Sequence, residues 1–179
     1  MLLKNQPSVC SDLLASLDTP EFCDIKIQSP DGDVPANKAI LSIRSDYFSR
    51  MFSTTNNFVE SSSRCCKLPY PKAVVKKVVT YLYSGEMDVS ELGLGQLLDL
   101  LELLNLMNFT EDFKKVESYA VNRINMRKFQ FSECLKNLDK CFVMRMDTLG
   151  ETLISHLSYF PWDWCQLEEI ADLSETMFV

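Results

Sequence analysis

The chain has 179 residues with 18 basic and 25 acidic side chains, and its formal net charge at pH 7 is −7. This length suits one domain of ordinary size, or one domain followed by a small helical extension. Hydrophobic residues make up 46% of the chain, which is ample for a packed core and excludes a disordered acidic polypeptide.

The negative charge is concentrated at the C-terminal end. All 18 Lys and Arg residues lie at or before Arg145, and the same part of the chain holds 18 of the 25 acidic residues. The acids that follow have no basic neighbour in sequence: Asp147, Glu151, Asp163, Glu168, Glu169, Asp172 and Glu175. A neutral body with an acidic end argues against a phosphate-binding surface, so no nucleic-acid partner is expected.

Neither a membrane span nor a secretory signal is predicted. The first seven residues lack the apolar run of a signal peptide. The most apolar stretch, residues 92–107, contains two acids and is shorter than the roughly 20 residues that a bilayer requires. An odd number of cysteines, seven in all, then indicates reduced thiols. We therefore expect a cytoplasmic or nuclear protein with no membrane partner.

The first half of the chain is expected to combine short helices with a small sheet. Asn37 is a good N-cap for one helix, and Ser45 or Asp46 for the next. Residues 22–27 alternate apolar and polar side chains, as a half-buried strand does. In chain order, the first expected elements are a helix at 12–17, capped by Ser11 or Asp12, and strands at 22–27 and 34–36 on either side of a turn at 31–33. Two helices then begin at the N-caps Asn37 and Ser45 or Asp46, and a strand follows at 65–68.

The second half is expected to be helical. A helix beginning near Pro71 and ending at Gly85 would place its valines on one face and its lysines on the other. Residues 92–107 are apolar nearly all round, which predicts a helix buried in the domain centre. Further helices are expected at 111–124, 131–142, 145–157 and 166–176. The predicted fold class is α+β to about Met107, followed by an all-helical extension.

No arrangement typical of a catalytic or metal site is found. His156 has no nucleophile and acid at recognisable spacing, and we expect it at the surface or edge of its helix. Cys65 and Cys66 would point to opposite faces of a strand and could not bind one ion together. Cys134 and Cys141 are expected to be small core residues. We therefore predict no enzyme, no metal and no cofactor; the alternative is a thiol enzyme using Cys65 or Cys66.

A basic cluster lies between residues 61 and 85, a stretch without acidic side chains: Arg64, Lys67, Lys72, Lys76 and Lys77. The lysines of the predicted helix fall on its outer face. This pattern favours a solvated helix face over a binding patch, which remains the alternative.

The order of these elements, with particular residues at particular places, is similar to that of the BTB/POZ family. The matching segments are residues 22–27 for the first core strand, 35–41 for the x-A-H-K-x-x-L segment, 44–52 for the S-x-Y-F-x-x-M-F block, Glu60-Ser61, 81–86 for the Y-x-Y-T/S-G block, and the leucine-rich helix to Met107. The resemblance implies a BTB/POZ core at residues 21–109, a small sheet surrounded by helices, after an N-terminal dimerisation helix region at 1–20.

Residues 110–179 resemble the start of a BACK region, whose first helix pair is also called the 3-box. The similar stretch is residues 132–160. Only this first part is represented, so we expect further domains, including one that binds a substrate protein, to lie outside this chain.

One residue departs from the family pattern. The histidine of the A-H-K segment is Asn37 here, which caps a helix at least as well, so the fold prediction is unaffected. Asp24 and Lys38 match family positions that can form a partly buried charge pair, with two separate solvated groups as the alternative.

The resemblance also implies a dimer. BTB domains pair through the N-terminal helix, where Leu13, Leu14 and Leu17 supply an apolar ridge. We therefore expect a two-fold symmetric homodimer. Packing of this helix on its own domain is the alternative.

A cullin-binding surface is the most specific implication. BTB adaptors that recruit cullin-3 carry a hydrophobic-x-Glu triplet after the Y-F-x-x-M-F helix, and Phe58, Val59 and Glu60 occupy that place. An aromatic side chain in a polar segment suits insertion into a partner's pocket. The alternative is that Phe58 folds back over its own core. Together with Tyr47 and Met51, the triplet forms the expected surface for the N-terminal region of cullin-3.

The leading hypothesis is thus a homodimeric substrate adaptor that joins cullin-3 into a cullin-RING ubiquitin ligase. The alternative from the same fold is a BTB scaffold or transcriptional-regulator dimer that binds corepressor-like peptides without cullin. The 3-box-like helices favour the adaptor.

Overall fold

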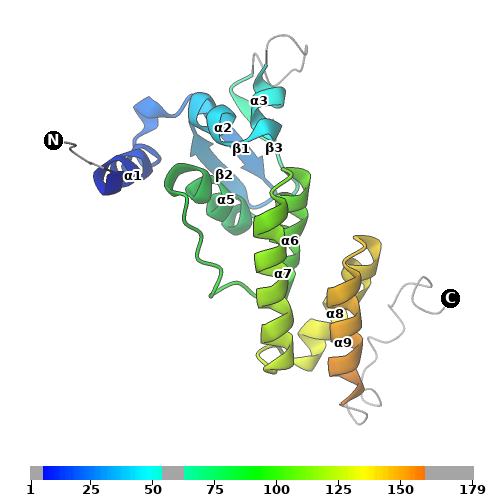
Figure 1. Ribbon diagram of the computed structural model, residues 1–179. Coiled ribbons are helices and arrows are strands. Elements are labelled where there is room, and N and C mark those ends of the chain that lie inside the picture. Colours follow the sequence, from blue (N-terminus) through cyan, green and yellow to red (C-terminus); the bar gives the residue numbers. More distant parts are fainter. Residues whose placement is uncertain (1–5, 54–62, 160–179) are drawn as a thin grey trace. The chain divides into compact units, whose positions relative to one another are not determined.

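The computed structural model describes residues 6–53 and 63–159 (Figure 1). The chain divides into two units. The first is formed by residues 1–88 together with 106–108, and the second by residues 89–105 together with 109–179. The α+β class is confirmed, because the first unit contains a small mixed sheet and the described part of the second unit is helical.

The first unit is built on a three-stranded sheet with the order β2-β1-β3. Its strands are β1 (Ile25–Ser29), β2 (Gly32–Ala36) and β3 (Cys65–Lys67). β1 pairs antiparallel with β2 and parallel with β3. Ile25 and Ile27 are buried while Lys26 between them is exposed, as the two-residue period of a strand requires. The turn at Pro30 and Asp31 leads into Gly32, the first residue of β2, whose φ of 140° lies in a region that favours glycine.

The helices of the first unit are α1 (Gln6–Ser16), the short 3₁₀ helix η1 (Pro20–Phe22), α2 (Lys38–Arg44), α3 (Asp46–Phe52) and α5 (Lys72–Ser84). α1 begins six residues before the predicted helix at 12–17. Pro7 is compatible with this start, because the first turn of a helix has no intrahelical partner for an N–H group. α5 packs against β1 and β2 through a row of buried valines. As predicted, Gly85 ends α5 in the left-handed conformation, with φ 77°.

The described helices of the second unit are α6 (Leu94–Leu106), α7 (Thr110–Asn125), α8 (Phe131–Val143) and α9 (Asp147–Ser158). α6 has buried leucines on every face, in agreement with the prediction of a buried helix. α7 and α8 each pack against α9. α6 and α8 are also joined by an ion pair between Asp99 and Lys140.

Side chains of α7 and α8 hold the start of α6. A carboxylate oxygen of Glu133 accepts the backbone N–H of Leu94 at 2.7 Å. Arg123 donates to the carbonyl oxygen of Leu92 at 2.6 Å, and its guanidinium lies 4.4 Å from the centroid of the Phe129 ring. These contacts fix both the helix N-terminus and the chain that leads into it.

His156 is buried, with 7% of its surface exposed, so the prediction that it lies at the surface or edge of its helix is wrong. It shares one face of α9 with the buried residues Leu149 and Leu153, which the helical repeat places inward. Burial, and secondarily the charge of Arg127, lower the pKa of the imidazole. At neutral pH His156 is therefore an uncharged core side chain.

The cysteines of β3 and α8 lie as predicted. Cys65 is exposed and its neighbour Cys66 is buried, so the two point to opposite faces. Cys134 and Cys141 are buried, and burial raises the pKa of their thiols to about 11 and about 12. These two thiols stay protonated at neutral pH and are poor nucleophiles.

Within residues 6–53 and 63–159, no helix has the length and apolar character needed to cross a membrane. In the same residues, no three His, Cys, Asp or Glu side chains are grouped so that they could bind a metal ion.

Candidate partner-binding site beside helix α3

Helix α3 is anchored in the first unit by Phe48, which is fully buried. The Phe48 ring stacks on Phe52 with a centroid distance of 5.6 Å and meets the Tyr47 ring edge-on at 5.3 Å. Because Phe48 faces inward, Tyr47 and Met51, which are four residues apart, share a neighbouring face and are half-buried. The helix thus presents these two side chains beside its buried anchor.

A cavity of 410 Å³, called here the α3 cavity, opens beside this face. It is lined by Asp46, Tyr47, Arg50 and Met51 of α3 and by Leu106 and Met107. Leu106 is 47% exposed, a large fraction for a leucine, whereas Met107 is buried. Asp46 and Arg50 are exposed and add one charge of each sign. The cavity can therefore receive an apolar side chain of a partner.

The structure brings together the predicted residues Tyr47 and Met51, but the sequence analysis missed the contribution of residues 106–108. These residues are far from α3 in sequence, so no local pattern joins them to it. The sequence did indicate that the chain turns after Met107, because Asn108 ends the apolar run and asparagine tolerates its observed φ of 62°.

The triplet Phe58, Val59 and Glu60 lies in the segment 54–62, outside the described residues. The segment follows directly after α3 and Ser53. Its predicted role in binding is therefore not tested by the coordinates, and neither is the alternative in which Phe58 covers its own core.

Lys38 contacts residues on both sides of this segment. Its ammonium donates to the carbonyl oxygen of Ser63 at 2.7 Å and lies 5.4 Å from the centroid of the Phe52 ring. The backbone N–H of Lys38 donates to a carboxylate oxygen of Asp24 at 2.7 Å. The two residues of the predicted charge pair thus touch through a backbone amide, and the lysine side chain reaches toward the end of α3.

Asn37 fills the N-cap position of α2 as predicted. Its side-chain oxygen accepts the backbone N–H groups of Ala39 and Ile40 at 3.0 and 3.3 Å. Its side-chain nitrogen donates to the carbonyl oxygen of Phe22 at 3.0 Å. The backbone N–H of Asn37 donates to the Tyr83 hydroxyl at 2.8 Å. The residue that replaces the family histidine therefore has defined partners on η1, α2 and α5.

The predicted dimerisation residues are all half-buried: Leu13 and Leu14 lie on α1, and Leu17 follows its last residue, Ser16. α1 packs against α5 of the same chain. Leu17 lines a cavity of 150 Å³ with Val34 and other residues of the first unit. The three leucines are thus partly covered by their own domain, and part of each side chain is exposed to solvent.

The fold and this site define a class of protein: an α+β interaction domain whose candidate site is a partly apolar cavity. A family model described as "BTB/POZ domain" matches residues 13–123, well over half of the chain. The chain belongs to the BTB/POZ family.

Curated relatives include Kelch-like proteins. Kelch-like protein 3 of Danio rerio is 30% identical over 112 residues, which cover 60% of this chain and 18% of that protein. Kelch-like protein 38 of Mus musculus is 26% identical over 174 residues, which cover 94% of this chain and 28% of that protein. The chain thus spans less than a third of the length of these relatives.

Among solved structures, the BTB domain of zebrafish PATZ1 is similar, with a TM-score of 0.50. The similarity covers 70% of this chain and 98% of that domain at 18% sequence identity. At this identity the likeness supports the fold and says nothing about partners.

Proposed function

We propose that this chain is a homodimeric adaptor module that recruits cullin-3 into a cullin-RING ubiquitin ligase. The observation that carries the proposal is the α3 cavity: Tyr47 and Met51, selected by their resemblance to adaptor residues, line it together. The cavity lies on the helix that leads into the hydrophobic-x-Glu triplet. Similarity to Kelch-like proteins supports an adaptor role. A substrate protein would bind through domains outside this chain.

The adaptor would act by binding alone. Phe58 would enter a pocket of cullin-3, where a buried aromatic anchor contributes about 2 kcal/mol or more. The α3 cavity would receive an apolar side chain in return. Asp46 and Arg50 are solvent-exposed, so their charges would set orientation and association rate more than affinity. The adaptor dimer would bind cullin-3 and the substrate protein at the same time.

Residues 110–179 would act as the 3-box and supply further contacts to cullin-3. The second unit has a cavity of 560 Å³ lined by Phe113 and by residues 143–146, where α8 turns into α9. Val143 is 70% exposed there and would contact the partner. The alignment with Kelch-like protein 38 covers 94% of the chain and so includes most of this region.

Substitutions in the triplet test the proposal. Phe58→Ala and Glu60→Lys should each weaken binding of the cullin-3 N-terminal region by about tenfold or more. The first removes an aromatic anchor, and the second reverses a charge that would accept hydrogen bonds. Calorimetric titration of the full chain with this region measures the affinity. Light scattering should show the same dimer mass for both variants.

Met51→Ala tests the α3 cavity itself and should also weaken binding. Met126→Ala is the matched control, because Met126 is an exposed methionine that lines neither cavity. Equal affinity of the wild-type chain and all three site variants would contradict the proposed site. A dimeric wild-type chain that does not bind cullin-3 at all would favour the scaffold alternative.

A further inference from the structure

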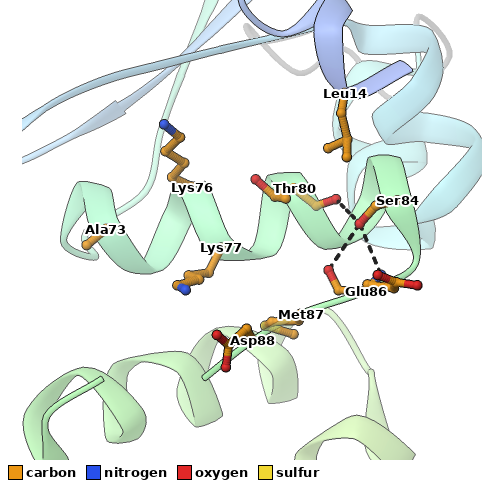
Figure 2. A pocket seen from close by; sticks show the side chains of 9 residues that line it. All are labelled: Leu14, Ala73, Lys76, Lys77, Thr80, Ser84, Glu86, Met87 and Asp88. Atoms are coloured by element: carbon orange, nitrogen blue, oxygen red, sulfur yellow. Dashed lines mark hydrogen bonds between the residues drawn. The ribbon is translucent and has the colours of Figure 1, made fainter. Parts of the chain in front are cut away.

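The lysines on the outer face of α5 lie in a surface of mixed charge (Figure 2). Lys76 and Lys77 line a cavity of 710 Å³ together with Glu86 and Asp88 of the chain that follows the helix. Two cations and two carboxylates balance each other, so this cavity selects no partner by charge. A solvated lysine face, which the sequence pattern favoured, stays the interpretation of these residues.

A cluster of one sign lies instead where α7 ends and the chain turns toward α8. This cluster, called here the basic end of α7, consists of Arg123, Arg127 and Lys128, and the sequence has no acidic residue from 118 to 132. Arg127 and Lys128 are exposed, and Arg123 is half-buried. Cations are favourable at a helix C-terminus, because the last carbonyl groups there have no intrahelical donors.

Arg123 is engaged within its own unit. Its guanidinium donates to the carbonyl oxygen of Leu92 at 2.6 Å and lies over the Phe129 ring. Its charge thus faces the segment that carries Glu91, and we count it as compensated. Arg127 and Lys128 are then the two exposed cations of the basic end.

Exposed apolar surface borders these two cations. Met126 and Tyr159 are each 68% exposed, a large fraction for side chains of this kind. The guanidinium of Arg127 lies 5.7 Å from the centroid of the Tyr159 ring, so the end of α7 and the end of α9 meet here. The basic end of α7 therefore combines positive charge with apolar surface, at the point where the chain leaves α9.

The chain that continues from Tyr159 has the complementary composition. Residues 160–179 lie outside the described residues, and their sequence contains five acidic residues and no basic one. It also contains Trp162 and Trp164, which follow Tyr159 by three and five residues. A chain extends by at most about 3.6 Å per residue, so the Cα atoms of both tryptophans stay within about 18 Å of that of Tyr159.

The spacing of the acids suits a contact with two adjacent cations. Glu168, Glu169 and Asp172 fall on one side of the helix predicted at 166–176. Two or more carboxylates can therefore approach Arg127 and Lys128 together. The aromatic residues that precede this helix would reach Met126 and Tyr159 first.

We propose that residues 160–179 dock on the basic end of α7 of the same chain. Their carboxylates would face Arg127 and Lys128, and their tryptophans would cover Met126 and Tyr159. Attachment at Tyr159 favours this occupant over a separate acidic partner, because a short tether gives an effective concentration of about millimolar.

The docked segment would leave the second-unit cavity open. Phe113, which lines that cavity, lies near the start of α7, whereas the basic end lies beyond its last residue. The inference does not rest on cullin-3 binding and stands whether or not cullin-3 binds.

Tryptophan fluorescence of the full chain tests the proposal, because Trp162 and Trp164 are its only tryptophans. Acrylamide is an uncharged quencher, so it measures exposure of the indoles without responding to local charge. Arg127→Glu combined with Lys128→Glu should raise the quenching constant by about twofold or more, since two attractions become repulsions. Added salt should raise the quenching constant of the wild-type chain, because exposed ion pairs are screened.

The control is Lys114→Glu combined with Lys115→Glu. These adjacent exposed lysines lie near the start of the same helix, so the change in net charge is equal. Quenching in this variant should stay close to that of the wild-type chain. Circular dichroism should give the same helix content for the wild-type chain and every variant.

A second charge reversal changes no described residue. Glu168→Lys combined with Glu169→Lys should also raise the quenching constant. Joining these two substitutions to Arg127→Glu and Lys128→Glu should restore the protection, because the charges attract again with their signs exchanged. Restoration would show that these two pairs face each other.

Four results would overturn the proposal. The first is quenching that does not change when Arg127 and Lys128 are reversed. The second is an equal rise in the control variant, which would indicate a response to net charge alone. The third is protection that is lost on dilution, which would place the segment on a second copy, since a tethered contact does not depend on concentration. The fourth is protection that appears only after the cullin-3 N-terminal region is added.

Discussion

At the scale of single residues, Asn37 shows how an amide can take the place of an imidazole. The side chain has an acceptor for the N-terminus of α2 and a donor for the carbonyl of Phe22. An ionised carboxylate cap would supply only the first of these bonds, because it has no donor. Burial raises the pKa of Tyr83, so its hydroxyl stays neutral as an acceptor for the Asn37 backbone N–H.

Asn37→Ala should destabilise the chain by about 1–3 kcal/mol, because it removes the cap and the bond to Phe22 together. Asn37→Asp keeps the acceptor and loses the donor, so it should cost less than the alanine variant. Urea denaturation of both variants measures the free energy of unfolding. A loss below about 0.5 kcal/mol for Asn37→Ala would show that these bonds do not matter to stability.

At the scale of secondary-structure elements, α8 supplies an end cap to α6. Glu133 lies in the first turn of α8, and its carboxylate accepts the N–H of Leu94 at the first residue of α6. A negative charge at a helix N-terminus is favourable because the backbone N–H groups there have no intrahelical acceptors. The two helices are therefore coupled by more than apolar packing.

Glu133→Ala should destabilise the chain by about 1–2 kcal/mol, since the Leu94 amide loses a charged acceptor. Glu133→Gln retains an acceptor without the charge and should lose less. Hydrogen exchange of the Leu94 amide, measured by NMR, should accelerate in the alanine variant more than in the glutamine variant. Equal exchange in the wild type and both variants would show that the carboxylate does not protect this amide.

The predicted elements were confirmed where neighbouring residues alone decide the structure. The alternation around Lys26 identified β1, although the strand runs from Ile25 to Ser29 and not over the predicted residues 22–27, since Phe22 belongs to η1. Gly85 correctly marked the end of α5. The burial of His156 was not predicted, because a histidine interrupts the pattern of apolar residues by which the inner face of α9 is recognised. The contact of residues 106–108 with the α3 cavity was missed because it depends on tertiary folding, which brings together segments that are distant in sequence.

At the scale of the whole molecule, the proposed self-association would depend on how the leucines at the N-terminal end divide their apolar surface. Leu13, Leu14 and Leu17 are only half-buried although α1 packs on α5. The exposed part of these leucines remains available to a second copy. The same ridge thus contributes to the fold of one chain and to its proposed pairing with another.

The chain should be a homodimer in light scattering at tens of micromolar, as expected for a BTB/POZ domain. Leu13→Asp combined with Leu17→Asp should shift it toward monomer, because a charge in an apolar interface loses solvation without gaining a partner. Ile154→Asp is the control, since Ile154 is an exposed aliphatic residue of α9. A monomeric wild-type chain at these concentrations would remove the dimer from the proposal.

The strand order also affects whether the sheet edges of two copies of the chain can pair with each other. In the sheet formed by the described residues, β2 and β3 are the outer strands. β2 contains Pro35, which has no N–H to offer, and β3 has three residues with Cys65 and Lys67 exposed. Short outer strands that carry proline or lysine resist open-ended pairing with another sheet. Main-chain pairing between copies is therefore disfavoured at both outer strands, so that contacts between copies would depend on side chains.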